Sequence, residues 1–175
     1  MSQAVDYSQF KKLGMESGAI RDSQIKSASD AFKSRAGCKA RLNHDEDYWC
    51  SKMAANARSP QWLEVTFPSD TVVTGIMIQV SEVHKWLEHV NGKRDFPEEN
   101  NLTDFFISHS PKPKPFLGAG KWIRGESFQT NYKWDAQKGI SYHAFKTPIT
   151  CRRIRLNCTK TLGGWCPALK MEWIG

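Results

Sequence analysis

The amino-acid sequence predicts an all-β domain, built as a sandwich or barrel of short antiparallel strands. Three observations indicate this fold class. Several short stretches alternate apolar with polar residues, which is the period of a strand with one buried face. Turn-forming residues separate these stretches. No long stretch repeats its apolar residues at helical spacing, so helices are not expected to cover a sheet.

The C-terminal stretch, residues 148–175, contains the clearest pair of strands. Residues 153–157 alternate polar and apolar side chains, and residues 169–174 do so again. The Gly-Gly pair at 163–164 and Pro167 mark the connection between them. Because an unpaired last strand would leave an exposed edge, we expect this strand to be paired inside the sheet.

The other expected strands precede this pair. Residues 61–67 place their apolar side chains on one face, and residues 72–80 are rich in β-branched side chains, with a turn at 68–70 between them. Gly75 indicates a bulge or a close approach of another chain segment. Shorter strand candidates are 103–108, 122–123, 127–128 and 142–145. The segments without a strand pattern are a polar lead-in at 1–12 and turns or loops at 13–29, 30–47, 52–60, 81–101 and 111–115.

Length and composition bound the possible functions. The 175 residues, 39% of them hydrophobic, suffice for one domain, expected over 13–175. The net charge of +7 favours anionic partners or simply solubility, because no dense basic run is present. No apolar run is long enough to span a membrane, and the first residues lack a secretory signal, so we expect an intracellular protein or a piece of a longer one. Asn101 and Asn157 begin N-glycosylation patterns that apply only to a secreted chain.

Three groups of short motifs follow one another along the chain. The first group consists of Leu13–Gly18, Asp22–Ile25 and Ser27–Ser29. The second consists of Trp49, Gln61–Val65, Thr74–Ile76 and Gln79. The third consists of Phe145, Pro148–Thr150, Arg153–Arg155 and Gly164–Glu172. In this order, and over most of residues 13–175, they resemble the discoidin domain family, also called the coagulation factor V/VIII C-type domain.

The resemblance implies a jelly-roll β-sandwich of about eight antiparallel strands, with the start and end of the domain side by side. It implies that three loops at one end form the ligand surface, here at about 29–43, 48–60 and 81–101. Family members bind glycans, phospholipid head groups, collagen or other proteins and are seldom enzymes. The resemblance also implies an extracellular or cell-surface location, although the given chain has no signal peptide and leaves a cytoplasmic location open.

The cysteines depart from the family pattern. The family usually joins a Cys before the first motif to a Cys after the last, and this chain has neither, which fits an intracellular member or one stabilised differently. Its five cysteines are an odd number, so at least one stays unpaired. Cys158 and Cys166 flank the Gly-Gly turn, and Cys38 and Cys50 would join the first two loops, so these four are the disulfide candidates. Buried thiols are the alternative.

The third loop supplies the first candidate ligand site. An exposed Trp86 would stack on a sugar ring or enter a lipid interface while basic side chains meet acidic head groups. In the alternative interpretation, Trp86 and Leu87 pack the loop onto the barrel. The candidates in this loop are His84, Lys85, Trp86, Leu87, Lys93 and Arg94.

The first loop supplies a second candidate, in which an apolar tip stands among basic residues. Phe32 would enter or stack on the ligand, with Lys33 and Arg35 beside it. Lys39 and Arg41 would extend the same basic surface. A loop packed onto the barrel by Phe32 is the other interpretation.

Further polar candidates lie where the first loop ends and the second begins. They are Asn43, His44 and Tyr48. His44 opens a run with three acidic residues, 45–47, that offers oxygen and imidazole ligands. Ca²⁺ needs six to eight oxygen ligands, and the run lacks the spacing of a known cage. We therefore expect no cofactor, leave Ca²⁺ open, and favour a solvated loop. Tyr48 would line a sugar site beside Trp49, which we expect to pack.

No pattern in the sequence indicates an enzyme. No nucleophile and base occur at a recognisable spacing, and there is no phosphate-binding glycine loop and no zinc spacing. Nucleic-acid binding would depend on charge alone and is not expected. We expect Trp165 and Trp173 to lie in the core.

Three functions remain, all of them binding functions. The first is a lectin-like adhesion module that binds a glycan or glycoconjugate at the loop end. The second is a peripheral membrane module for acidic phospholipids, and the third a receptor domain for an extracellular protein. Salt separates the first two, because ionic screening weakens lipid docking and barely affects a neutral sugar. An oligomer would raise avidity, but no residue pattern indicates its interface.

Overall fold

The computed structural model describes residues 7–44, 48–80, 101–111, 121–130 and 139–175, and every structural statement refers to these residues. Strands dominate and the helices are single 3-10 turns, so the predicted all-β class is confirmed. In chain order the elements are η1 (Tyr7–Gln9), η2 (Asp22–Gln24), β1 (Ile25–Ser27), η3 (Lys33–Arg35), η4 (Gly37–Lys39), β2 (Trp49–Cys50), β3 (Gln61–Val80), β4 (Leu102–Ser110), β5 (Ile123–Gln129), β6 (Ile140–Thr161) and β7 (Ala168–Ile174).

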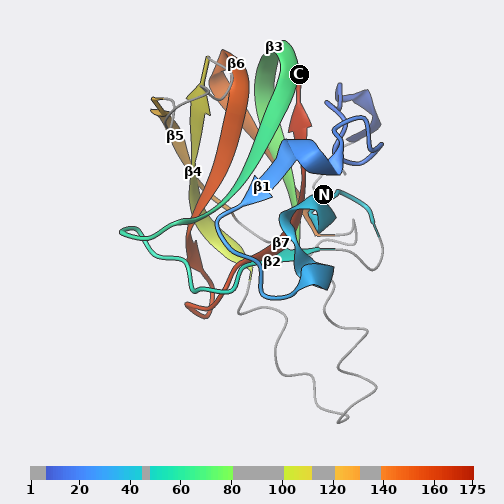
Figure 1. The fold of residues 1–175 in the computed structure, drawn as a ribbon. Helices are drawn as coiled ribbons and strands as arrows, with labels where there is room; N and C mark the ends of the chain where they lie inside the picture. The colour runs from blue at the N-terminus through green and yellow to red at the C-terminus, as the bar shows by residue number, and fades with distance from the viewer. Residues whose placement is uncertain (1–6, 45–47, 81–100, 112–120, 131–138) are drawn as a thin grey trace, which may run out of the picture.

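Two long strands, β3 and β6, run antiparallel to each other over most of their length and take part in both layers of the molecule. The first part of β3 is flanked by β1, and the last part of β6 by β4, which pairs in turn with β5. The second part of β3 is flanked by β7, which pairs with β2. Because β3 and β6 bend over the top of the molecule in Figure 1, one continuous sheet folds into the two facing layers of a sandwich.

The bend in β3 lies where the sequence predicts a turn, at 68–70. The strand continues through these residues, but its register against β6 shifts between Thr66 and Thr71. The two predicted strands are therefore the two arms of one bent strand. A second shift follows at Gly75, where an added Cβ would lie 2.7 Å from the Tyr142 ring, so the close approach predicted there is confirmed.

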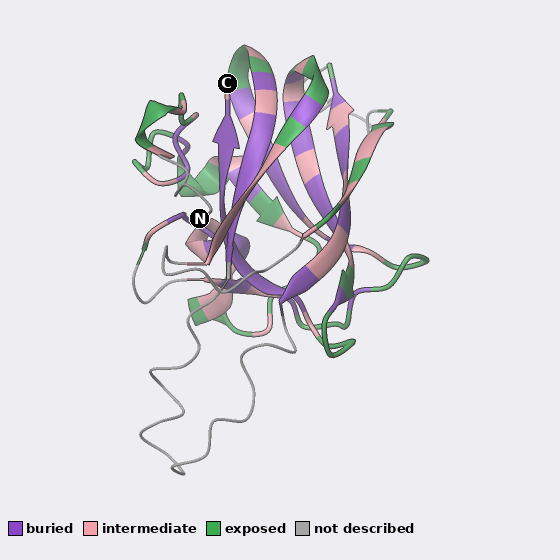
Figure 2. Ribbon diagram, turned by 180° about the vertical axis from the view of Figure 1, so that it is seen from behind, coloured by how far each residue is buried: buried purple, intermediate pink, exposed green. Residues whose placement is uncertain are grey.

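The core fills the space between the two layers. Alternate residues of β3, among them Leu63, Val65 and Phe67, are buried, as the period of two predicts. Trp49 and Trp173 are fully buried, which confirms the packing role expected for both. Figure 2 shows buried residues lining the inner side of the sandwich and exposed ones concentrated in turns and outer positions. Burial of apolar surface at about 25 cal/mol per Å² is the main stabilising term for such a core.

The paired strands β3 and β6 carry a buried ion-pair cluster. Glu64 on β3 accepts hydrogen bonds from Arg153 and Arg155 on β6, each at 2.9 Å. The Arg155 guanidinium lies 4.0 Å from the ring centroids of both Trp62 and Trp122. The two arginines pair with Glu64 across β3 and β6, so removal of one partner would leave a buried charge without its counterpart.

The two ends of the domain lie side by side, as the resemblance implies. Lys12 forms a bridge with Ile174 of β7. The Leu13 N–H donates to the Trp173 carbonyl, and the Gly175 N–H donates to Lys11, each at 2.9 Å. The last strand is therefore paired on both sides, which confirms the expectation that it does not form an exposed edge.

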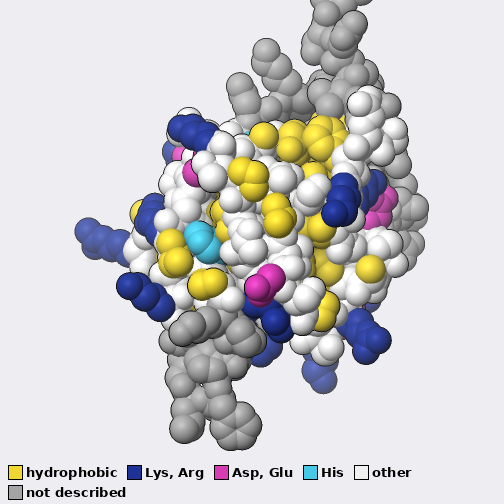
Figure 3. All heavy atoms as spheres, turned by 90° about the horizontal axis from the view of Figure 1, so that it is seen from above, with side chains coloured by type: hydrophobic (Ala, Val, Ile, Leu, Met, Phe, Trp, Pro, Cys, Tyr) yellow, Lys and Arg dark blue, Asp and Glu magenta, His cyan; other side chains and the backbone are white. Residues whose placement is uncertain are grey.

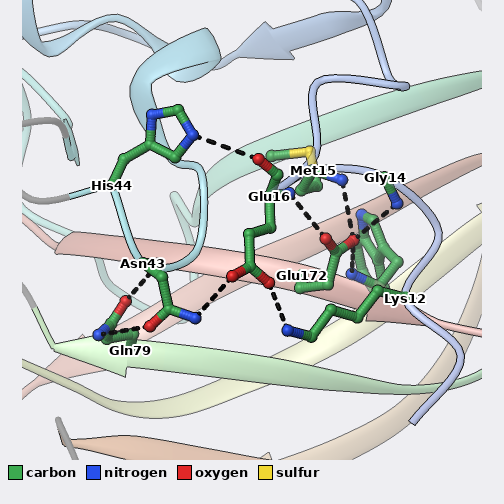
Figure 4. A network of polar contacts seen from close by, with 9 residues as sticks. Lys12, Gly14, Met15, Glu16, Asn43, His44, Gln79 and Glu172 are labelled. Carbon is green, nitrogen blue, oxygen red and sulfur yellow. Dashed lines mark hydrogen bonds and ion pairs between the residues drawn. The ribbon is translucent and has the colours of Figure 1, made fainter. Parts of the chain in front are cut away.

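A single carboxylate, Glu172, ties the first described residues to the last strand. Glu172 of β7 accepts backbone N–H groups from Gly14, Met15 and Glu16 at 2.7–3.1 Å, and from Trp173 at 3.0 Å (Figure 4). Burial raises the pKa of Glu172, while these four donors favour its ionised form. We call residues 11–16 together with Glu172 the terminal latch.

Candidate functional site

A hollow lies between the segment just before η3, the end of β2 and the turn after β6. These segments lie at the bottom of Figure 1. The volume of the hollow is about 380 Å³. Two exposed aromatic side chains, Phe32 and Trp165, stand on its rim. We call it the loop-end hollow, and its lining residues are Ala31, Phe32, Cys50, Ser51, Lys52, Trp165 and Cys166.

The first wall of the hollow is held by the buried Trp49. The indole N–H of Trp49 donates to the Ser29 carbonyl at 3.0 Å and to Asp30 at 3.1 Å. Next in the chain, the Ala31 N–H donates to the Cys50 carbonyl at 2.8 Å. These bonds fix the backbone just before Phe32, whose side chain is left 70% exposed.

The second wall is the turn that joins β6 to β7. The Thr161 hydroxyl donates to the Trp165 carbonyl at 2.9 Å, and the Gly164 N–H donates to the Thr161 carbonyl at 3.2 Å. Gly164 has a φ of +74°, which a glycine adopts without strain. Trp165 is 55% exposed, so its expected place in the core is wrong: it lies outside both strands, where no layer covers it.

Large exposed apolar side chains concentrate at this end. In the described part of the chain they number six, and four of these stand at the loop end. The four are Phe32, Met53, Leu162 and Trp165, with exposures of 70%, 58%, 61% and 55%. The other two, Val72 and Ile123, lie near the bends at the opposite end, where Figure 3 shows apolar side chains surrounded by Lys and Arg.

The basic residues expected around Phe32 divide between surface and interior. Lys33 and Lys52 are exposed beside the hollow. Arg35 lies over the Tyr48 ring, 3.8 Å from its centroid, and burial raises the pKa of Tyr48. Arg41 does not extend the basic surface, because it is buried and its guanidinium donates to backbone carbonyls and to Asp22.

Asn43 and His44 lie beside the terminal latch rather than beside the hollow. The Asn43 amide donates to the Glu16 side chain at 2.8 Å, and its backbone N–H donates to Gln79 at 2.9 Å. His44 contacts the Glu16 carbonyl at 3.2 Å, as Figure 4 shows. Asn43 has a φ of +58°, which turns the chain toward these partners. Its polar groups are therefore used within the fold.

The candidates of the third loop lie outside the described residues. These are His84, Lys85, Trp86, Leu87, Lys93 and Arg94. The described chain enters this loop from β3 and leaves it into β4. These six residues therefore remain predictions.

The expected disulfides are not formed: all five cysteines are free. Cys158 is fully buried inside β6, whereas Cys166 lies in the turn at the hollow. Cys38 lies in η4, and Cys50 instead faces the hollow with Cys166. Proximity along the sequence therefore did not identify which cysteines lie close together in the fold.

The two glycosylation patterns are both occluded. Asn157 is 5% exposed, and its amide donates to Ser108 at 2.9 Å and to the Phe106 carbonyl at 3.2 Å. Asn101 is also 5% exposed. Attachment of a glycan needs a free asparagine amide, so neither side chain is accessible in the folded domain.

A second hollow lies on the flank of the sandwich and is the main alternative location for a ligand. It has a volume of about 520 Å³ and is bordered by β4 and β5. Arg124 lies over the Phe106 ring there, 4.0 Å from its centroid, and Asp104 accepts from Gln129 at 3.0 Å. Its polar groups bond to each other, which leaves fewer of them to meet a ligand.

The described residues contain no group of three or more His, Cys, Asp or Glu side chains that could hold a metal ion. The acidic run 45–47 lies outside them. No helix in the described part of the chain has the length and apolar character needed to cross a bilayer.

Comparison with known families decides what this fold is. The model of the F5/8 type C domain matches residues 24–173. The chain belongs to the F5/8 type C family. The discoidin resemblance drawn from the three motif groups is therefore confirmed.

Curated relatives of this family member are long proteins. Human coagulation factor V is 28% identical over 167 residues, which cover 93% of this chain and 7% of factor V. Human neuropilin-1 is 27% identical over 171 residues, which cover 97% of this chain and 17% of neuropilin-1. The chain thus spans only a small part of the relatives that it matches.

Solved structures share the fold at low identity. A family 32 carbohydrate-binding module of NanJ from Clostridium perfringens, in complex with galactose, has a TM-score of 0.59 at 15% identity, over 89% of this chain and 97% of that one. Chitosan-binding module 2 from a Paenibacillus chitosanase/glucanase, in complex with chitotriose, has a TM-score of 0.60 at 18% identity, over 86% and 95%. These likenesses establish the jelly-roll fold.

Sequence reasoning missed Trp165, Met53, Leu162 and Lys52 as surface candidates. The signal for Trp165 was present: it stands between a Gly-Gly pair and Cys-Pro, a composition typical of a turn rather than a strand. Nothing comparable marks Met53, Leu162 or Lys52, whose exposure follows from the arrangement of the loops in space.

Proposed function

We propose that this domain is a non-enzymatic recognition module that binds a glycan in the loop-end hollow. The observation that carries the proposal is the pair of exposed aromatic side chains, Phe32 and Trp165, that line one concave surface. An aromatic face covers the apolar face of a sugar ring, and a hollow of this size accommodates one or two sugar residues. Lys52 supplies a donor for sugar hydroxyls at the same place.

The fold supports the same proposal. Structural neighbours with this jelly roll are described as bound to galactose and to chitotriose. The proposed mode of binding needs no metal and no reacting group. The third loop, including Trp86, would border the same end of the domain, and an extracellular or cell-surface location would present the hollow to glycans.

The test is a glycan array of galactosides, N-acetylgalactosaminides and chito-oligosaccharides, followed by titration of the best ligand. We expect Trp165→Ala and Phe32→Ala each to weaken binding about tenfold or more, since an aromatic contact contributes about 1 kcal/mol or more beyond buried area. Val72→Ala and Ile123→Ala remove exposed apolar side chains at the opposite end and serve as matched controls. Trp86→Ala tests the third loop separately.

Full binding by both Trp165→Ala and Phe32→Ala would contradict the site. A ligand retained by these variants but lost in Arg124→Ala would move it to the flank hollow. Absence of any bound glycan would contradict the proposed function.

A second function, docking on acidic phospholipid, is favoured by one observation. Phe32, Met53, Leu162 and Trp165 form four exposed apolar tips at one end, with the exposed Lys33 beside them. Apolar tips enter the interface while lysines meet anionic head groups. Vesicles of phosphatidylserine and phosphatidylcholine test this function. Binding only to the former, weakening steeply with salt, would support it over the glycan proposal.

A further inference from the structure

Two cysteines line the loop-end hollow. Cys50 ends β2 on the first wall, and Cys166 precedes β7 on the second, and both line the same concave surface. The sequence pattern suggests other partners, Cys38 for Cys50 and Cys158 for Cys166.

The backbone places the two residues close together. Cys50 is the strand partner of Ala168, and the Ser51 N–H donates to the Pro167 carbonyl at 3.1 Å. Cys166 is two residues before Ala168, so along an antiparallel pair it is the diagonal neighbour of Cys50 on the same side. Cys166 itself lies in the turn just before β7, which begins at Ala168.

The other three cysteines are worse partners for either residue. Cys158 and Cys151 are buried within β6, at 0% and 1% exposure. Cys38 lies in η4 and is not among the residues that line the hollow. Cys166 lies close enough to Cys50 to affect it, since burial first and this neighbour second raise the pKa of Cys50 to about 11.

We propose that Cys50 and Cys166 form a disulfide that joins the two walls of the loop-end hollow. The oxidant is a low-molecular-weight disulfide such as oxidised glutathione. One cysteine, as thiolate, attacks it and releases one reduced thiol, forming a mixed disulfide. The second cysteine loses its proton, attacks the mixed disulfide and releases a second reduced thiol. Two protein thiols are oxidised by two electrons, and one reagent disulfide is reduced to two thiols.

The bond would hold the aromatic rim in one arrangement. Its first end is tied to Phe32 through the bond from Ala31 to the Cys50 carbonyl, and its second end directly follows Trp165. Rigid placement of two contact groups lowers the entropy lost on binding. The bond would close a loop of more than a hundred residues, which restricts the unfolded chain strongly.

The experiment maps disulfides in the full chain after equilibration with reduced and oxidised glutathione. Free thiols are alkylated, the chain is unfolded and digested without reduction, and the peptides are identified by mass spectrometry. We expect a linked peptide pair containing Cys50 and Cys166, with Cys38, Cys151 and Cys158 alkylated. The linked protein should melt about 5–15 °C above the reduced one.

Matched variants sharpen the assignment. Cys166→Ser should leave Cys50 free for alkylation, whereas Cys38→Ser should leave the link intact. Complete alkylation of Cys50 in the unsubstituted protein, or its linkage to Cys38, would overturn the proposal. The mapping uses no ligand, so its outcome is independent of whether the hollow binds a glycan.

Discussion

The terminal latch and the loop-end hollow lie toward opposite ends of β7. Glu172 of the latch stands near the end of this strand, whereas Trp165 and Cys166 of the hollow belong to the turn that precedes it. At the latch, Glu172 is buried and accepts four backbone N–H groups. At the hollow, the backbone is bonded within each wall while Phe32 and Trp165 stay exposed. Stabilising hydrogen bonds therefore concentrate at the latch, and exposed apolar side chains at the hollow. Substitutions at the latch should mainly change stability, and those at the hollow should mainly change binding.

The largest expected effect is on the latch. Glu172→Ala leaves buried backbone donors without an acceptor, and we expect it to lower the free energy of unfolding by about 3–5 kcal/mol. Urea denaturation measures the loss, and Glu172→Gln, which keeps one acceptor oxygen, should lose less. The folded fraction should bind ligand as the unsubstituted domain does. A loss below about 1 kcal/mol would contradict the importance given to the latch.

The next effect is a dependence of stability on pH, and it arises from His143 of β6 rather than from the latch or the hollow. His143 packs edge-on against Phe105 at 5.1 Å, and burial lowers its pKa to about 4. The unfolded imidazole, with a pKa of 6.5, binds a proton that the folded one excludes. Its contribution to stability is therefore complete above pH 6.5 and falls as the pH drops toward 4, by about 2–3 kcal/mol.

Glu172 in the latch changes stability with pH in the opposite direction to His143. Burial raises the pKa of Glu172, so protonation of that carboxyl as the pH falls adds stability to the folded state. Denaturation followed from pH 7 to pH 4 should show a smaller loss in His143→Gln and a larger loss in Glu172→Gln. Equal pH dependence in all three proteins would contradict both assignments.

Glycines at the two ends offer a smaller and closely matched comparison. Gly14 in the latch has a φ of +116°, and an added Cβ would lie 2.7 Å from the Ala19 Cβ. Gly164 at the hollow has a φ of +74° with nothing within 4 Å. We expect Gly14→Ala to cost about 2–3 kcal/mol and Gly164→Ala about 1 kcal/mol, measured by thermal unfolding. Equal costs would show that backbone strain alone decides.

The smallest effect on stability is expected at Trp165, one of the two aromatic residues proposed to contact the ligand. Trp165→Ala removes a side chain that is 55% exposed, so we expect a change within about 0.5 kcal/mol in the free energy of unfolding. Trp173→Ala, which removes a fully buried side chain of β7, should cost about 3–5 kcal/mol. A large loss in Trp165→Ala would place that indole in a packing role instead.

The fold was predictable from sequence because it depends on local alternation and on motif order. Residues 153–157 and 169–174 alternate as strands do, and both stretches are strands of the sheet, each paired with β3, which lies between them. The turn expected at 68–70 became a bend inside β3, because the pairing with β6 continues on both sides of it. That pairing joins residues far apart in the sequence, which a local signal does not record.

The candidate site was less predictable. Arg41 and Asn43 carry polar groups suited to a ligand, yet both bond to the N-terminal segment. Their partners are set by how the first residues cross β7. The hollow itself requires that residues 31–32 and 165–166 meet, and no pattern within either segment specifies the other.

The two bent strands also bear on how the chain reaches its native state. Gln61 pairs with Cys158, and Gly75 pairs with both Ala144 and Ile174, so neither layer can be completed from neighbouring residues. Folding must close very long loops before most ladder bonds form, which places the rate on a scale of milliseconds to seconds. Because β3 and β6 belong to both layers, the layers should form and melt in a single cooperative transition.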